Sequence, residues 1–162
     1  MKILAVCALV CAVMALTAAA ADAAQEEQED AEEELTLTTR TWTRIGNRTF
    51  LFVPRKLNWA DAERNCKTMD GHLGSVHSLW EYNLLRNLIV TDGEKATWLG
   101  GSDSEVEGKW RWIDGTPFNF DYWCSGQAVK DNQDCLQINY SARRCWDDVE
   151  CTRRLPSVCV AN

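Results

Sequence analysis

The sequence predicts an α+β fold with two helices, several short strands and a long loop rich in tryptophan and cysteine. Segments 59–69 and 78–90 carry apolar residues at helical spacing. Short runs of β-branched and aromatic residues before and after them are typical of strands. Six cysteines lie beyond residue 40, and an even number of cysteines in an exported chain predicts disulfides.

The first 21 residues have the pattern of a secretory signal peptide. A positively charged start, Met1-Lys2, precedes an apolar run over residues 3–16, and small residues follow at 17–21. The apolar run is too short to span a bilayer comfortably, and no later segment could do so. We therefore expect a secreted, extracellular protein without a membrane span.

Residues 22–40 are expected to form a disordered acidic linker or a removable pro-segment. Eight acidic residues and no basic residue lie between positions 22 and 34, and such a run repels itself. This tract accounts for the net charge of −7, so the remaining residues are electrically balanced. A folded part without a basic excess argues against nucleic-acid binding.

Local signals place the regular elements of a domain that we expect over residues 41–162. A turn at Gly46-Asn47 separates two strands that Pro54 ends. Asn58 can cap a helix that Gly71 stops, and Ser78 opens a second helix that ends near residue 90. Further strands are expected over residues 96–99, 135–140, 144–149 and 157–160.

The long segment 100–134 shows little periodicity, yet it carries enough aromatic residues to order itself. Its aromatic residues are Trp110, Trp112, Phe118, Phe120, Tyr122 and Trp123. Carboxylates then follow at Asp147 and Asp148, between cysteines that are expected to pin the loops. Carboxylates on crosslinked loops are what a calcium-dependent binding module needs.

Several motifs, taken in order, resemble the C-type lectin-like domain over about residues 41–162. They are residues 62–66, 71–76, Trp98-Leu99-Gly100, residues 110–115 and Trp146-Asp147-Asp148. Within that family the chain looks most like the small secreted fish proteins, the ladderlectins and type II antifreeze proteins. The resemblance implies a fold of two helices packed on small antiparallel sheets, with a long loop stapled by a disulfide.

The resemblance also implies a disulfide pattern. The spacing alone permits fifteen pairings of six cysteines, whereas the family pattern joins Cys66 to Cys159, Cys135 to Cys151, and Cys124 to Cys145. Zinc is disfavoured because the chain has no Cys-x-x-Cys pair.

In sugar-binding relatives, one calcium ion is held by a loop tripeptide such as Gln-Pro-Asp, a later Glu and an Asn-Asp pair. Hydroxyl groups of the sugar complete the coordination shell of this ion. This chain departs from that pattern, since Gln127-Ala128-Val129 loses the proline and one acid, and Gln133 replaces the Glu. The expected metal ligands are Gln127, Asp131, Gln133, Asp147 and Asp148, and the expected sugar-binding residues are Gln127, Gln133, Asp147, Asp148 and Trp123.

The calcium site is therefore degenerate, and a second interpretation stays open. Asp147 and Asp148 would then be solvated loop acids, or would bond to the backbone and to Arg143 and Arg144. Trp123 is the aromatic residue expected nearest a ligand, because it adjoins Gln127 through the bridged loop.

The most consistent function is a carbohydrate-binding module, for instance one that recognises microbial glycans in innate immunity, with galactose- or mannose-type specificity left open. A calcium-independent, protein-binding relative is the alternative, and oligomers are compatible with both. Ice binding is disfavoured by nearby charges at Lys130, Asp131, Arg143, Arg144 and Asp147.

No catalytic motif appears, and His72 and His77 are interpreted as packing or surface residues, so we expect no enzyme. Two N-glycosylation sequons begin at Asn47 and Asn139. The expected strand position of Asn139 could hide that side chain.

Overall fold

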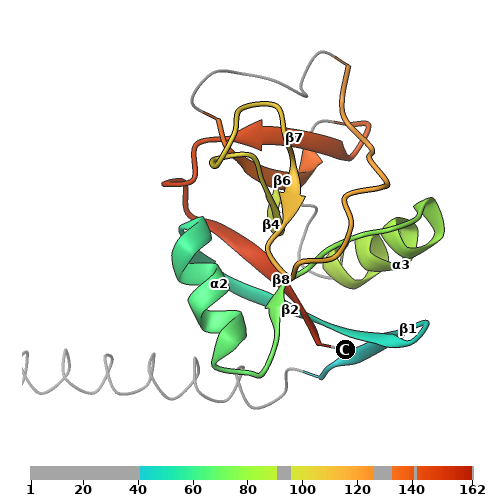
Figure 1. Cartoon of the computed structure of the whole chain (residues 1–162). Coiled ribbons are helices and arrows are strands. Elements are labelled where there is room, and N and C mark those ends of the chain that lie inside the picture. The colour runs from blue at the N-terminus through green and yellow to red at the C-terminus, as the bar shows by residue number, and fades with distance from the viewer. Residues whose placement is uncertain (1–40, 91–95, 126–132, 141, 162) are drawn as a thin grey trace, which may run out of the picture. The chain divides into compact units, whose positions relative to one another are not determined.

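The computed structural model describes residues 41–90, 96–125, 133–140 and 142–161 (Figure 1). The expected signal peptide and acidic linker lie outside these residues. In the described part, the strands form one sheet in the order β1-β2-β8-β4-β6-β7, with β3 paired to β8 and β5 paired to β4. The elements are β1 (Thr43–Ile45), β2 (Arg48–Leu57), α2 (Trp59–Lys67), β3 (His72–Leu73), α3 (Leu79–Val90), β4 (Thr97–Ser102), β5 (Arg111–Trp112), β6 (Cys135–Tyr140), β7 (Cys145–Val149) and β8 (Leu155–Ala161).

The first hairpin confirms the expected turn, but its second strand ends later than the sequence predicts. Gly46 adopts a φ of +66° between β1 and β2, a conformation that favours glycine. Pro54 does not end β2, which continues to Leu57. Instead the β2–β8 register shifts between Val53 and Leu57, because proline has no N–H to donate to a regular ladder.

Both helices begin where the sequence predicts. The side chain of Asn58 accepts a 2.8 Å hydrogen bond from the backbone N–H of Asp61 and so caps α2. The Ser78 hydroxyl accepts from the N–H of Glu81 at 3.2 Å at the start of α3. Helix α2 ends earlier than expected, at Lys67, and the N–H of Gly71 then bonds back to the carbonyl of Cys66.

Three disulfides join distant segments, and they are the three that the resemblance implies. Cys66 pairs with Cys159, Cys135 with Cys151, and Cys124 with Cys145. The first two lie in a buried cluster around Trp98, which is fully buried. They therefore anchor α2 and the chain after β7 to the central strands.

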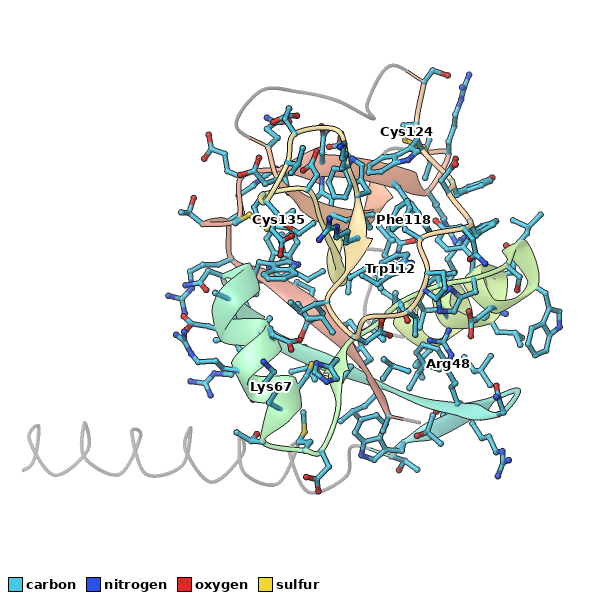
Figure 2. The ribbon with its side chains drawn as sticks, viewed as in Figure 1. Arg48, Lys67, Trp112, Phe118, Cys124 and Cys135 are labelled. Carbon is cyan, nitrogen blue, oxygen red and sulfur yellow. A yellow bond between two sulfur atoms is a disulfide. The ribbon has the colours of Figure 1, made fainter. Side chains whose placement is uncertain are left out.

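The long loop packs through its aromatic residues, as the sequence predicts. Trp146 on β7 is fully buried, and four rings of the loop meet it nearly edge-on at centroid distances of 5.6–6.0 Å. These rings belong to Trp112, Phe118, Phe120 and Trp123. Figure 2 shows two of them, Trp112 and Phe118, side by side, with centroids 4.8 Å apart. The loop therefore contributes to the core without long regular elements.

Candidate functional site

Residues 122–124 of the long loop are fastened along the outer edge of β7. The N–H of Trp146 donates to the carbonyl of Tyr122 at 2.8 Å, and the N–H of Cys124 donates to the carbonyl of Trp146 at 2.9 Å. The Cys124–Cys145 disulfide closes the same junction. These contacts hold residues 122–124 beside the strand that carries Asp147 and Asp148.

The two carboxylates of β7 are buried. Asp147 has 3% of its surface exposed and Asp148 has none. Their interpretation as solvated loop acids is therefore wrong, because both belong to a strand that packs inside the domain. The alternation of side chains along a strand also directs neighbouring residues to opposite faces, so Asp147 and Asp148 differ in their surroundings.

Gln137 on β6 holds Asp147 across the ladder. The two residues are cross-strand partners, and the Nε2 of Gln137 donates a 2.9 Å hydrogen bond to Oδ2 of Asp147. Gln137 is not among the site residues expected from the sequence. The signal that could have found it is a polar residue within the alternating segment 135–140, on the face opposite Leu136 and Ile138.

Two glutamine side-chain oxygens of this region are buried and have no hydrogen-bond partner among the residues that the structure describes. They are Oε1 of Gln133, just before β6, and Oε1 of Gln137. Buried acceptors of this kind are uncommon and call for an explanation such as an unseen ion, water or ligand group. Amide and carboxylate oxygens are also ligands that calcium accepts, so the donor set of Gln133, Asp147 and Asp148 fits that ion in chemistry.

The other two expected ligands, Gln127 and Asp131, lie outside the described residues. Among the residues that the structure describes, no group of three or more histidine, cysteine or acidic side chains could hold a metal ion. The complete ligand set predicted from the sequence thus depends on the segment 126–132.

Trp123 belongs partly to the aromatic core. It is half-buried, its ring centroid lies 4.7 Å from that of Trp110, and its backbone forms a bridge with Trp146. The partial exposure leaves it available to a ligand only on the side away from these neighbours. It is thus a rigidly held aromatic side chain at the start of the candidate site.

Asp103 connects the end of β4 to the start of β6. Its N–H donates to the carbonyl of Asp134 at 3.3 Å, and its Oδ2 accepts from the N–H of Gly108 at 2.9 Å. The residue is 2% exposed. Burial raises the pKa of this carboxyl above its ordinary value, and the hydrogen bond from Gly108 opposes that shift.

His72 has a structural environment. Its Nδ1 lies 2.8 Å from Oε1 of Glu63, whose other oxygen accepts from the N–H of Leu73 at 2.8 Å. The buried Glu63 thereby fastens α2 to β3.

No helix in the described residues is long and apolar enough to cross a membrane.

Comparison with known proteins identifies related sequences and structures. The lectin C-type domain model matches residues 55–161. A type-2 ice-structuring protein of Osmerus mordax is 39% identical over 128 residues, which cover 78% of this chain and 73% of that protein.

Two lectins are related at similar identity. Ladderlectin of Oncorhynchus mykiss is 33% identical, with 72% of this chain and 63% of that protein covered. The galactose-specific lectin nattectin of Thalassophryne nattereri is 34% identical, with 75% and 78% covered. Among solved structures, a Ca²⁺-dependent type II antifreeze protein in its Ca²⁺-free form superimposes with a TM-score of 0.71 at 36% identity, covering 75% of this chain and 97% of that one.

Proposed function

Because the chain belongs to the C-type lectin domain family, we propose that it is a secreted carbohydrate-binding protein whose ligand meets the region where the long loop joins β7. Gln133, Asp147, Asp148 and Trp123 are the described members of the proposed ligand-binding set. Gln127 and Asp131 complete the proposed set. Galactose-type glycans are the first candidates, since nattectin is a galactose-specific lectin.

The observation that carries this proposal is the covalent and hydrogen-bonded junction between the loop and β7. The Cys124–Cys145 disulfide and the backbone bonds of Trp146 hold residues 122–124 of the loop against β7. A preformed site loses little conformational entropy when a ligand binds. Sugar hydroxyls can then bond to oxygen-bearing side chains whose positions are already set.

A calcium ion is proposed as the bridge between protein and sugar. When bound, the ion would offer open coordination positions to vicinal hydroxyls of the sugar. The buried carboxylates of Asp147 and Asp148 would supply the charge, and the unpartnered Oε1 of Gln133 would supply a neutral oxygen. Gln137 would hold the Asp147 carboxylate in orientation through its Nε2.

Galactose and mannose resins test the proposal. Retention of the full-length protein on galactose resin in calcium, with release by a chelator, is the expected result. Asp148→Ala should abolish calcium binding in a calorimetric titration and abolish retention. Asp121→Ala, at an exposed carboxylate of the same loop, is the matched control and should behave as the unmodified protein.

Two outcomes would favour other functions. Retention that a chelator does not affect would indicate a calcium-independent glycan site. No retention on either resin or on a broad glycan array, together with a recovered protein partner, would favour a protein-binding member of the family. The proposed glycan function fails in that second case.

Ice binding is the second candidate, because type-2 ice-structuring proteins are among the relatives at 35–39% identity. The charged residues near the site argue against ice binding less strongly than the sequence indicates, because Asp147 is buried and not on the surface. Arg143 is exposed and still argues against a flat, uncharged face. Ice crystals that change shape and a gap between melting and freezing points would support this function.

A further inference from the structure

We propose that the exported protein carries one N-linked glycan, on Asn47, and that the first sugars of this glycan cover the exposed side chain of Trp80. The inference goes beyond glycan recognition and rests on the proposed secretion, since the modification takes place in the secretory pathway. The unused second sequon, at Asn139, is part of the same proposal.

The two sequons lie in opposite environments. Asn47 is exposed in the turn between β1 and β2. Asn139 is 7% exposed, and its Oδ1 and Nδ2 are buried with no hydrogen-bond partner in the described part of the chain. It lies on β6, which pairs with β4 on one side and β7 on the other. The side chain of Asn139 projects from a face of this sheet, and its burial leaves no room for a glycan unless the residues packed on that face are displaced.

The backbone at Asn139 reinforces this conclusion. Its φ of +61° is in the left-handed region, which asparagine tolerates better than most residues. The register of the β6–β7 ladder shifts in the same stretch, between Gln137 and Tyr140. This position therefore has a conformational reason to be asparagine, independent of glycosylation.

Contacts of Thr49 define when the glycan must be added. The transferase recognises the hydroxyl residue of the sequon as well as the asparagine. In the folded domain, Oγ1 of Thr49 donates to the carbonyl of Ala161 at 3.2 Å, and the two residues are paired between β2 and β8. Because this hydrogen bond occupies the Thr49 hydroxyl, we expect addition to precede the pairing of β2 with β8, the last strand in the described part of the chain.

The reaction is ordinary glycosyl transfer. The amide nitrogen of Asn47 attacks the anomeric carbon of an oligosaccharide carried on a lipid pyrophosphate. A carbon–nitrogen bond forms, the bond from that carbon to the pyrophosphate oxygen breaks, and the lipid pyrophosphate leaves. One amide proton passes to a base of the transferase, and no oxidant or reductant is needed.

The exposed Trp80, at the start of α3, lies beside the modified turn. Trp80 is 59% exposed and Leu79 is 49% exposed, the two largest exposures among the large apolar side chains that the structure describes. A Cβ atom built on Gly46 would lie 3.7 Å from the Trp80 ring. The indole therefore rests against the turn that carries Asn47, where the apolar face of a sugar ring can shield it from water.

Mass spectrometry of the full chain, secreted from a eukaryotic host, tests the site. The expected product carries one N-glycan, which Asn47→Gln removes. Ser141→Ala destroys the second sequon without replacing Asn139 and should leave the glycan in place. A secreted protein without a glycan on Asn47, or with one on Asn139, would overturn the proposal, and so would a chain that stays in the cytosol. Lectin activity of the unglycosylated protein would show that the proposed function survives separately.

Hydroxyl-radical footprinting tests the covering of Trp80. Oxidation of Trp80 should be several-fold slower in the glycosylated protein than after an amidase removes the whole glycan. Tyr122, which is 37% exposed and lies beside β7, is the internal control and should react equally in both. Because the amidase leaves a carboxylate at the modified position, Asn47→Asp should match the deglycosylated protein. Equal oxidation of Trp80 in all three proteins would show that the glycan points away from α3.

Discussion

The side-chain amide of Gln137 donates a 2.9 Å hydrogen bond to the carboxylate of Asp147, and both side chains are buried. The two residues face each other on β6 and β7. A buried carboxylate needs such donors, because it has given up hydrogen bonds with water. Gln137 is thus a positioning residue for Asp147, whether or not a cation also binds there.

Replacement of Gln137 by leucine should destabilise the domain. Gln137→Leu keeps a similar volume but removes the donor to Asp147, and loss of a hydrogen bond to a charged group lowers the free energy of unfolding by about 1.5–3 kcal/mol. Urea denaturation measures the change. Gln133→Leu is the control for loss of a nearby amide. A change below about 0.5 kcal/mol for Gln137→Leu would show that Asp147 does not depend on this donor.

Removal of the Cys124–Cys145 disulfide should loosen the junction between the long loop and β7. The double variant Cys124→Ser/Cys145→Ser opens a loop with a sequence separation of 21, which costs about 3 kcal/mol in the chain-entropy model. Amide hydrogen exchange of Cys124 and Trp146, whose N–H groups form the junction, should accelerate. Sugar retention should fall as well. Unchanged exchange would mean that the aromatic packing alone holds the loop.

Arg48, which is labelled in Figure 2, and Glu81 form a buried ion pair that joins β2 to α3. Arg48 also donates to the Ser75 hydroxyl at 2.7 Å. Arg48→Met should lower stability by about 3–5 kcal/mol, because it leaves the Glu81 carboxylate buried without its counter-charge. The combined variant Arg48→Met/Glu81→Leu should lose much less. Thermal or urea unfolding measures both.

An exposed ion pair supplies the control for that cycle. Arg111 and Glu105 are bonded at 2.6 Å with both side chains largely exposed, so Arg111→Ala should cost below about 1 kcal/mol. If Arg48→Met is as mild as Arg111→Ala, the buried pair contributes no more than a surface pair.

The contribution of Asp103 to the free energy of unfolding should decrease as the pH rises from 3.8 through the raised pKa of the folded carboxyl. Because burial raises the pKa of the folded carboxyl above its unfolded value of 3.8, the folded state holds the proton more tightly. Its favourable contribution is present below pH 3.8 and is lost as the pH rises through the raised folded pKa. Asp103→Asn removes this dependence. Urea unfolding from pH 3 to 7 should therefore show the variant gaining stability relative to the unmodified protein as the pH rises, and parallel curves would contradict the shift.

The regular elements could be predicted well because their signals are local. Asn58 and Ser78 cap helices through bonds to residues three positions away, and the alternation over residues 135–140 is visible without knowledge of the fold. The errors occur where distant residues decide. In the sequence, Pro54 indicates the end of a strand. In the structure β2 continues beyond it, because β2 pairs with β8 again at Leu57 after a shift of register.

The sequence could predict which residues belong to the candidate site, but not their burial or their contacts. A motif resemblance identifies Asp147 and Asp148, whereas their burial and the contact with Gln137 depend on how β6 and β7 pair. The same pairing buries Asn139 while the turn leaves Asn47 exposed. Two sequons with equal sequence signals thus have unequal surroundings.

The amino-acid order alone determined the helix starts, the strand periodicity, the number of cysteines and the family motifs, because these depend on neighbours a few residues apart. Only the tertiary structure decided which polar groups lose their water, since burial requires segments that are far apart in the chain to meet. Asp147 and Gln137 are the clearest case, because neither residue's burial nor their hydrogen bond exists until two strands align.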